Sequence, residues 1–132
     1  MDEIYREYIL DLYRNPLNKK TLADFDVRHR EYNPSCGDDI EVFIKFGEDG
    51  RIADIGHQGA GCAISQAAVS LITEHVKGKT KEEILVISDE QMIEMLGISV
   101  SPMRLKCATL GLQAIRKGIE HGLNEFNESK RI

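Results

Sequence analysis

Three cysteines stand in three different local settings of this 132-residue chain, and each setting suits a reactive thiol. Cys36 follows the turn sequence Asn-Pro-Ser and precedes Gly37 and Asp38. Cys62 closes the sequence Gly-Ala-Gly-Cys, and Cys107 directly follows a lysine. Proteins hold zinc and iron–sulfur clusters through thiolates, and a carboxylate is a harder ligand that exchanges more readily. Three thiols and the Asp38 carboxylate are therefore a candidate four-ligand metal site.

The spacing of the cysteines leaves the metal assignment open. Cys36 and Cys62 are 26 residues apart, and Cys62 and Cys107 are 45 residues apart, whereas zinc fingers use closely paired cysteines. Free cysteines also serve as small buried apolar residues, an interpretation that fits Cys62 and Cys107. Cys36 differs, because Pro-Ser-Cys-Gly-Asp favours an exposed turn over a core segment. Residue types alone support metal binding and structural burial about equally.

Local electrostatics favours a thiolate at Cys62 and Cys107. Cys62 comes at the expected N-terminus of a helix, where the helix dipole and free N–H groups stabilise negative charge. Cys107 lies near the start of the last expected helix, close to Arg104 and Lys106. Because a thiolate both binds metal and attacks sulfur, these settings suit a ligand or a nucleophile.

The elements that must position these thiols follow from hydrophobic periodicity and turn signals. Helices are expected over residues 3–14, 63–77, 81–86, 89–96 and from Ser101-Pro102 to about residue 120. Strands are expected over 40–46 and 51–57, joined by a Gly-Glu-Asp-Gly hairpin, with residues 15–38 as a loop and 124–132 as a frayed tail. The expected fold is α+β, a small antiparallel β-sheet with helices packed on one side, formed by one domain over residues 1–132.

Composition and charge argue against several function classes. The formal net charge of −5, without a basic stripe, disfavours nucleic acid as a partner. No stretch approaches the roughly 18 apolar residues that span a bilayer, and the acidic start lacks the apolar region of a secretory signal. An odd number of cysteines then indicates a reducing cytoplasm, with metal or thiol chemistry in place of disulfides.

The three cysteine sequences, in this order, resemble those of the U-type iron–sulfur scaffold family, which comprises IscU, SufU and the N-terminal domain of NifU. The matching stretches are Asn33–Asp38, Gly59–Ser65 and Lys106–Leu110, and the sequence Val-Lys-Gly-Lys-Thr over Val76–Thr80 also fits. The likeness extends over residues 4–120, nearly the whole chain.

The resemblance implies a cytoplasmic scaffold, not an enzyme. On such a scaffold a [2Fe–2S] cluster is built from iron and from the persulfide sulfur of a pyridoxal-phosphate cysteine desulfurase, then passed to acceptor proteins. By motif, Cys36, Cys62 and Cys107 are the expected ligands of the cluster, or of zinc or iron in its absence. Asp38 is the expected labile fourth ligand, and Cys107 is also the expected persulfide acceptor. The chain is expected to be a monomer or a cluster-bridged dimer.

Two departures from the family pattern keep alternatives open. Lys106 stands where IscU-type members carry the histidine before the third cysteine, which leaves Asp38 as fourth ligand. The chaperone-binding run of those members is altered over Ser99–Cys107. The motifs are closer to SufU, but the extra segment that SufU-type members insert between Cys62 and Cys107 is absent. One alternative is a zinc-dependent sulfurtransferase partner of a cysteine desulfurase, the role that SufU-type members have. The other is a structural zinc domain that takes no part in sulfur transfer.

The remaining motifs suggest no separate site. His57, five residues before Cys62, is the one histidine expected to have a chance of reaching the cysteines; surface or packing roles are expected for His29, His75 and His121. Gly59-Ala60-Gly61 is interpreted as a tight turn that aims Cys62, because no Gly-Lys-Ser/Thr follows to complete a phosphate loop.

Overall fold

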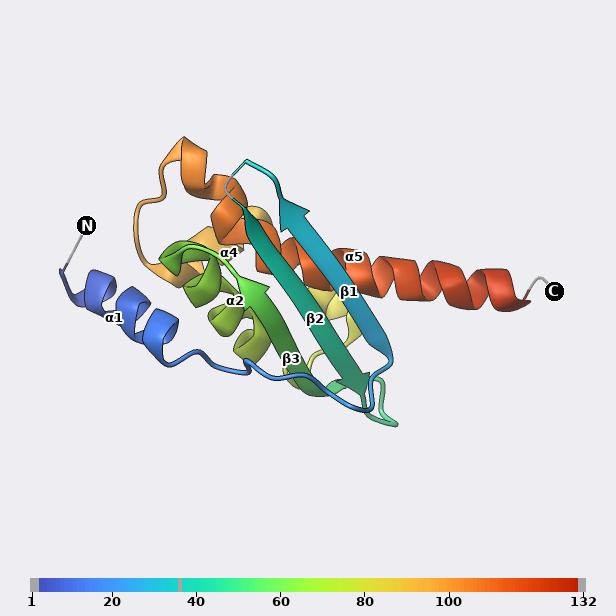
Figure 1. Cartoon of the computed structure of the whole chain (residues 1–132). Helices are drawn as coiled ribbons and strands as arrows, with labels where there is room; N and C mark the ends of the chain where they lie inside the picture. Colours follow the sequence, from blue (N-terminus) through green and yellow to red (C-terminus); the bar gives the residue numbers. More distant parts are fainter. Residues whose placement is uncertain (1–2, 36, 131–132) are drawn as a thin grey trace.

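Figure 1 shows the computed structural model, which describes the backbone of residues 3–35 and 37–130 and the side chains of residues 6–35 and 37–121. The elements follow in the order α1 (Glu3–Arg14), β1 (Val27–Asn33), β2 (Asp38–Phe46), β3 (Ile52–Ala60), α2 (Ala63–His75), α3 (Lys81–Leu85), α4 (Asp89–Leu96), the 3₁₀ turn η1 (Pro102–Arg104) and α5 (Leu105–Lys130).

The three strands form one antiparallel sheet in the order β1-β2-β3, with α2 and α5 behind it (Figure 1). Val27 of β1 pairs with Ile44 of β2, and Asp39 of β2 pairs with Ala60 of β3. Strand β3 runs three residues beyond the expected end, because the glycine-rich stretch up to Ala60 still pairs with β2. This arrangement confirms the expected α+β class with a small antiparallel sheet.

Strand β1 corrects the sequence analysis, which expected a loop throughout residues 15–38. The strand has few apolar residues, so it lacks the alternation that marks a half-buried strand. Its exposed arginines instead pair with carboxylates across the sheet: Arg28 with Glu41 at 2.9 Å, and Arg30 with Asp39. Its other face packs on α5. Cross-strand ion pairs and this packing therefore define a strand that periodicity does not reveal.

The helices occupy nearly the expected positions. Helix α1 has the expected bounds, α2 ends two residues early at His75, and α5 is preceded by the 3₁₀ turn η1, with Pro102 in its first turn. Because α5 is helical through Lys130, helical backbone extends over residues 124–130; fraying of this tail stays a prediction.

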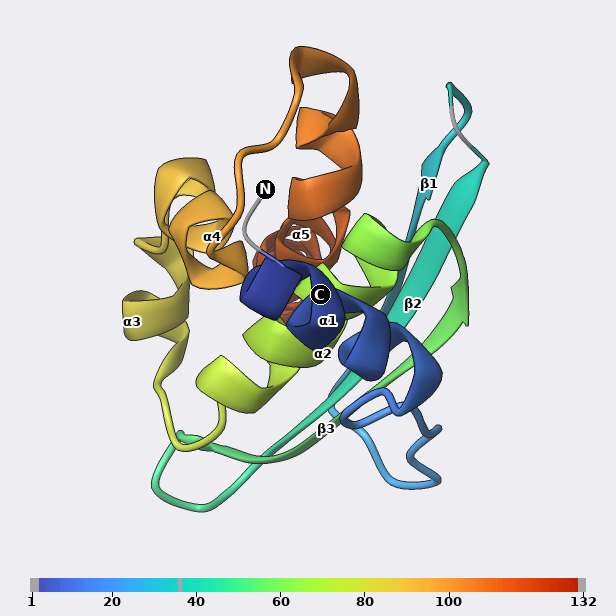
Figure 2. The same ribbon diagram turned by 90° about the vertical axis from the view of Figure 1, so that its left-hand side faces the viewer.

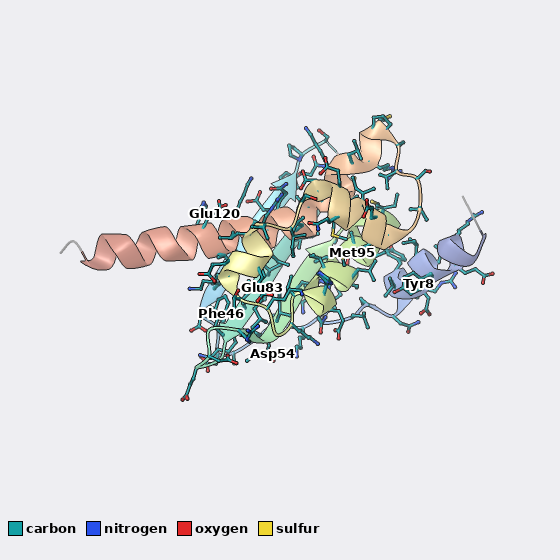
Figure 3. The ribbon with its side chains drawn as sticks, turned by 180° about the vertical axis from the view of Figure 1, so that it is seen from behind. Tyr8, Phe46, Asp54, Glu83, Met95 and Glu120 are labelled. Atoms are coloured by element: carbon teal, nitrogen blue, oxygen red, sulfur yellow. The ribbon has the colours of Figure 1, made fainter. Side chains whose placement is uncertain are left out.

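One buried apolar cluster joins the sheet to the helices. Its large fully buried members include residues of β2, β3, α2, α3, α4 and α5: Ile40, Val42, Ile44, Ile55, Ile72, Ile84, Met92, Leu96, Leu112 and Ile115. Figure 3 shows the molecule from behind, with Met95 on α4. Glu83 of α3 lies near one end of the sheet, where Phe46 of β2 and Asp54 of β3 are also found. Arg51 links the sheet and α3 at this end through an ion pair with Glu83 at 3.3 Å.

The opposite end of the sheet gathers the starts of three elements. The start of β2, the N-terminus of α2 and the start of α5 lie together there (Figures 1 and 2). The sheet and the two helices packed on it thus bring together segments that are far apart in the sequence.

Candidate metal centre

Asp38, Cys62 and Cys107 meet where these three elements begin. Asp38 is the first residue of β2, Cys62 is the N-cap of α2, and Cys107 lies in the first turn of α5. One ligand atom from each of the three side chains lies within 4.8 Å of the other two. Asp38 and Cys107 are each 1% exposed, whereas Cys62 is half-buried and gives the cluster a side that solvent can reach.

The donor set and its spacing fit a metal ion that prefers thiolates. With zinc–sulfur bonds of about 2.3 Å, tetrahedral ligand atoms lie roughly 3.8 Å apart. A separation of up to 4.8 Å between the ligand atoms needs only a small contraction to meet that value. The same thiolates are the ligands that iron–sulfur clusters use.

Cys36, the remaining expected ligand, lies outside the described residues. The turn around it is partly described: the Gly37 N–H donates to Asn33 O at 2.8 Å, and the Ser35 N–H donates to Asn33 Oδ1 at 3.1 Å. Gly37 has φ = +72°, which glycine adopts at little cost. Participation of Cys36 stays a prediction.

The stretch Gly59–Gly61 brings α2 close to β2. The Cys62 N–H donates to Asp38 Oδ1 at 3.0 Å. A Cβ at Gly61 would lie 2.6 Å from that same oxygen, so any larger residue would push Asp38 away. Gly59, at φ = +131°, leaves similarly little space, since a Cβ there would lie 1.9 Å from Asp39 O. These close approaches explain why glycines precede Cys62. The expected tight turn over Gly59–Gly61 is wrong, because Gly59 and Ala60 still pair with β2 as part of β3, and Gly61 alone connects the strand to Cys62.

Hydrogen bonds from the first turn of α2 hold the Cys62 sulfur. The Ser65 N–H donates to Cys62 Sγ at 3.5 Å, and Ser65 Oγ lies 3.8 Å from the same sulfur. Ser65 is fully buried. Ser65 was not among the residues predicted for the site, although its position three residues after a helix-capping residue is the usual signal for such a contact.

Arg104 supplies positive charge at the rim of the site. A hydrogen bond with Cys62 and the electrostatic interaction with Cys62 and Cys107 raise the pKa of the Arg104 guanidinium above its ordinary value. A cavity of about 550 Å³ adjoins this rim, between the β1–β2 turn and η1. Its lining residues are Asn33, Ser35, Pro102, Met103, Arg104 and Lys106.

The histidines lie elsewhere. His57 is 1% exposed, its Nε2 lies 2.8 Å from Leu17 O, and burial lowers its pKa. It therefore anchors the segment after α1 and is not part of the Asp38–Cys62–Cys107 cluster. His29 bonds to Glu31 and packs edge-on against His121, 4.9 Å between ring centres. Of the histidines considered in the sequence, none joins the cluster among the described residues.

Residues 4–127 match the model of the NifU-like N terminal domain. The chain belongs to this family. The family assignment confirms the resemblance read from the three cysteine sequences, and it covers the β-sheet, the helices and all three cysteines.

Relatives of this NifU-like domain carry two different descriptions. The zinc-dependent sulfurtransferase SufU of Bacillus subtilis (strain 168) is 38% identical over 136 aligned positions, which cover 90% of this chain and 91% of SufU. The iron–sulfur cluster assembly scaffold protein IscU 1 of Archaeoglobus fulgidus is 37% identical over 116 residues, 88% of this chain and 74% of IscU 1.

A solved structure shares the fold. It is described as a candidate iron–sulfur cluster assembly scaffold protein for the SUF system from Fervidobacterium islandicum AW-1, with a TM-score of 0.74 and 26% identity. The match covers 89% of this chain and 97% of that one. Within the described residues of this NifU-like domain, no helix is long and apolar enough to cross a membrane.

The alignments with SufU and IscU 1 differ in how many gaps they require in this chain. The alignment with SufU has 136 positions, more than the 132 residues of this chain, so SufU contains residues with no counterpart here. The alignment with IscU 1 has 116 positions and covers 88% of the chain, which leaves almost no gaps. The aligned region of IscU 1 therefore matches this chain almost residue for residue, while IscU 1 as a whole is longer, since the match covers 74% of it.

Proposed function

We propose that this chain is an iron–sulfur cluster assembly scaffold that holds a nascent [2Fe–2S] cluster as its cargo and passes it to acceptor proteins. The observation that carries the proposal is the convergence of Asp38, Cys62 and Cys107 within 4.8 Å. Cys36 is the further thiolate ligand, supplied from the turn before Asp38. The near-gapless alignment with the scaffold IscU 1 agrees with this role.

Each ligand has a distinct part in the proposed scaffold. Cys36, Cys62 and Cys107 bind iron as thiolates, and Asp38 contributes a harder oxygen ligand that leaves first when the cluster is released. Because one Asp38 oxygen accepts the Cys62 N–H at 3.0 Å, the carboxylate stays anchored to the site when the other oxygen exchanges. Half-buried Cys62 marks the side from which partners reach the cluster.

The sulfur comes from a cysteine desulfurase. The Cys107 thiolate attacks the outer sulfur of the enzyme-bound persulfide, forming a new S–S bond and releasing the enzyme thiolate. Reduction of that transferred sulfur to sulfide requires two electrons from a thiol or ferredoxin-type reductant. The scaffold is a carrier and not an enzyme, works in the cytoplasm, and is a monomer or a dimer bridged by the cluster.

A second candidate is a zinc-dependent sulfurtransferase partner of the desulfurase. The specific observation in its favour is the 38% identity to SufU of Bacillus subtilis. Zinc bound by the same cysteines and Asp38 would hold the thiolates until the desulfurase displaces one of them to receive sulfur. Against it stand the residues of SufU that have no counterpart in this chain. The third alternative, a structural zinc domain, predicts that chelation unfolds the protein and that no desulfurase binds.

Anaerobic reconstitution separates these candidates. The purified protein is incubated with ferrous iron, the host's cysteine desulfurase, cysteine and a dithiol reductant, and the visible absorption, iron and acid-labile sulfide are measured. A chromophore with about two irons and two sulfides per cluster, transferable to an apo-ferredoxin, is the expected result. Retained zinc with faster desulfurase turnover and no chromophore would instead establish the sulfurtransferase.

A further inference from the structure

Ser65 lies outside the proposed ligand set and contacts the sulfur of one ligand, Cys62. It is the third residue of α2 and fully buried. Its Oγ donates to Cys62 O at 3.0 Å and lies 3.8 Å from Cys62 Sγ, and its backbone N–H donates to that sulfur at 3.5 Å. Two groups of one residue thus converge on Cys62.

We propose that Ser65 is a positioning residue for Cys62, and that its hydroxyl donates to the Cys62 sulfur when that sulfur is a ligand; this inference rests on the proposed function. In the structure the hydroxyl donates to Cys62 O at 3.0 Å, and its oxygen lies 3.8 Å from Cys62 Sγ. Rotation of the hydroxyl hydrogen about the Cβ–Oγ bond is enough to direct it from the carbonyl to the sulfur. The Ser65 N–H already donates to the same sulfur at 3.5 Å.

The local packing keeps this hydroxyl near the sulfur. A Cβ at Gly61 would lie 2.3 Å from Ser65 Oγ, so glycine at position 61 leaves the space that the hydroxyl occupies. The same glycine admits the Asp38 carboxylate, whose Oδ1 accepts the Cys62 N–H. Asp38 therefore fixes the Cys62 backbone, and Ser65 fixes its sulfur.

Two consequences follow from a hydroxyl that donates to a ligand sulfur. Partners that orient metal ligands commonly raise metal affinity by about 10- to 100-fold. Hydrogen bonds to cluster sulfurs also raise the reduction potential, because they withdraw electron density from the ligand. Ser65 is thus expected to tune how tightly the site holds its cargo and how easily the cargo is reduced.

The test compares Ser65→Ala with Ser70→Ala, a matched control. Ser70 is also fully buried on α2, but its hydroxyl accepts the Leu17 N–H at 3.1 Å, away from the cysteines. Zinc affinity is measured by competition with a chelator, and the sulfur-to-metal charge-transfer band is recorded with cobalt(II). Ser65→Ala is expected to weaken zinc binding about tenfold, shift the cobalt band and lower the reduction potential of a reconstituted cluster.

Ser70→Ala is expected to lower the free energy of unfolding only. Its zinc affinity and its cobalt(II) charge-transfer band should equal those of the wild type. Equal affinity and an identical cobalt band in wild type and Ser65→Ala would overturn the inference while leaving the scaffold proposal intact. A wild-type protein that binds neither metal nor cluster would instead refute the proposed function. If Ser65→Ala fails to fold, the pair Ser65→Thr and Ser65→Val, equal in size with and without a hydroxyl, supplies the same comparison.

Discussion

Helix α2 begins differently from helices α3 and α4. The short helices begin at Thr80 and Ser88 and have complete capping boxes, in which the first and fourth residues exchange hydrogen bonds. At α4 the Gln91 N–H donates to Ser88 Oγ at 3.1 Å, and the Ser88 N–H donates to Gln91 Oε1 at 2.8 Å. At α2 the capping atom is the sulfur of Cys62, 3.5 Å from its donor.

The second half of the box at α2 comes from another element. The acceptor for the Cys62 N–H is Asp38 of β2, 24 residues earlier in the chain. A thiol is a weak acceptor, and the favoured caps are serine, threonine, aspartate and asparagine. The difference indicates that α2 uses a weaker cap so that a thiolate and a carboxylate can stand together at its N-terminus, whereas α3 and α4 are capped for stability alone.

The largest expected effect follows from removing a thiolate. Cys36→Ser, Cys62→Ser and Cys107→Ser should each abolish stable cluster binding, because a hydroxyl is a poor replacement for a thiolate on iron. Iron and sulfide are counted after anaerobic reconstitution of each variant. The assignment collapses if all three variants retain the wild-type cluster.

Removal of the Asp38 carboxylate should affect release and stability together. Asp38→Ala is expected to slow cluster loss, because the exchangeable oxygen ligand is gone. It should also lower the free energy of unfolding by about 1 kcal/mol, because the partly buried Cys62 N–H loses its acceptor. The cluster half-life and urea unfolding of the metal-free protein are the measurements.

Asp38→Asn is the matched control, because an amide oxygen can still accept the Cys62 N–H. It should slow cluster loss as Asp38→Ala does, with most of the stability retained. Faster cluster loss in Asp38→Ala would contradict the role of Asp38 as the ligand that leaves first.

The smallest expected effect concerns α4. Ser88→Ala removes the side-chain half of a complete capping box and should cost about 1 kcal/mol of unfolding free energy, with zinc affinity unchanged. Urea unfolding and chelator competition measure the two quantities. A lower zinc affinity in this variant would show that the caps of α4 and α2 are coupled across the molecule, and would contradict the separate roles of these two helix N-termini.

Sequence patterns predicted the elements that have strong local signals. Ser88 with Gln91 and Thr80 with Glu83 have the spacing of capping boxes, and both boxes are present. Strand β1 was missed, because it is held by backbone pairing with β2 and by packing on α5, with exposed ion pairs such as Arg28–Glu41 beside them, and none of these leaves a periodic pattern.

The site was predicted in its residue types but not in its contacts. The family motifs predicted Asp38, Cys62 and Cys107 as ligands, and the fold brings these three side chains together. The bond between Asp38 and the Cys62 N–H could not be read from the chain, since it depends on how β2 and α2 pack. Ser65 had only the weak signal of its distance from Cys62.

Cys62→Ser tests most directly whether the cysteine N-cap of α2 lowers the stability of the protein and is needed for metal binding. Unfolding of the metal-free variant and its zinc affinity are measured beside the wild type. We predict opposite changes: the unfolding free energy rises by about 0.5–1 kcal/mol, because serine is a favoured cap, while tight zinc binding is lost. A variant that is less stable than the wild type without metal, or that binds zinc as tightly, would contradict the account.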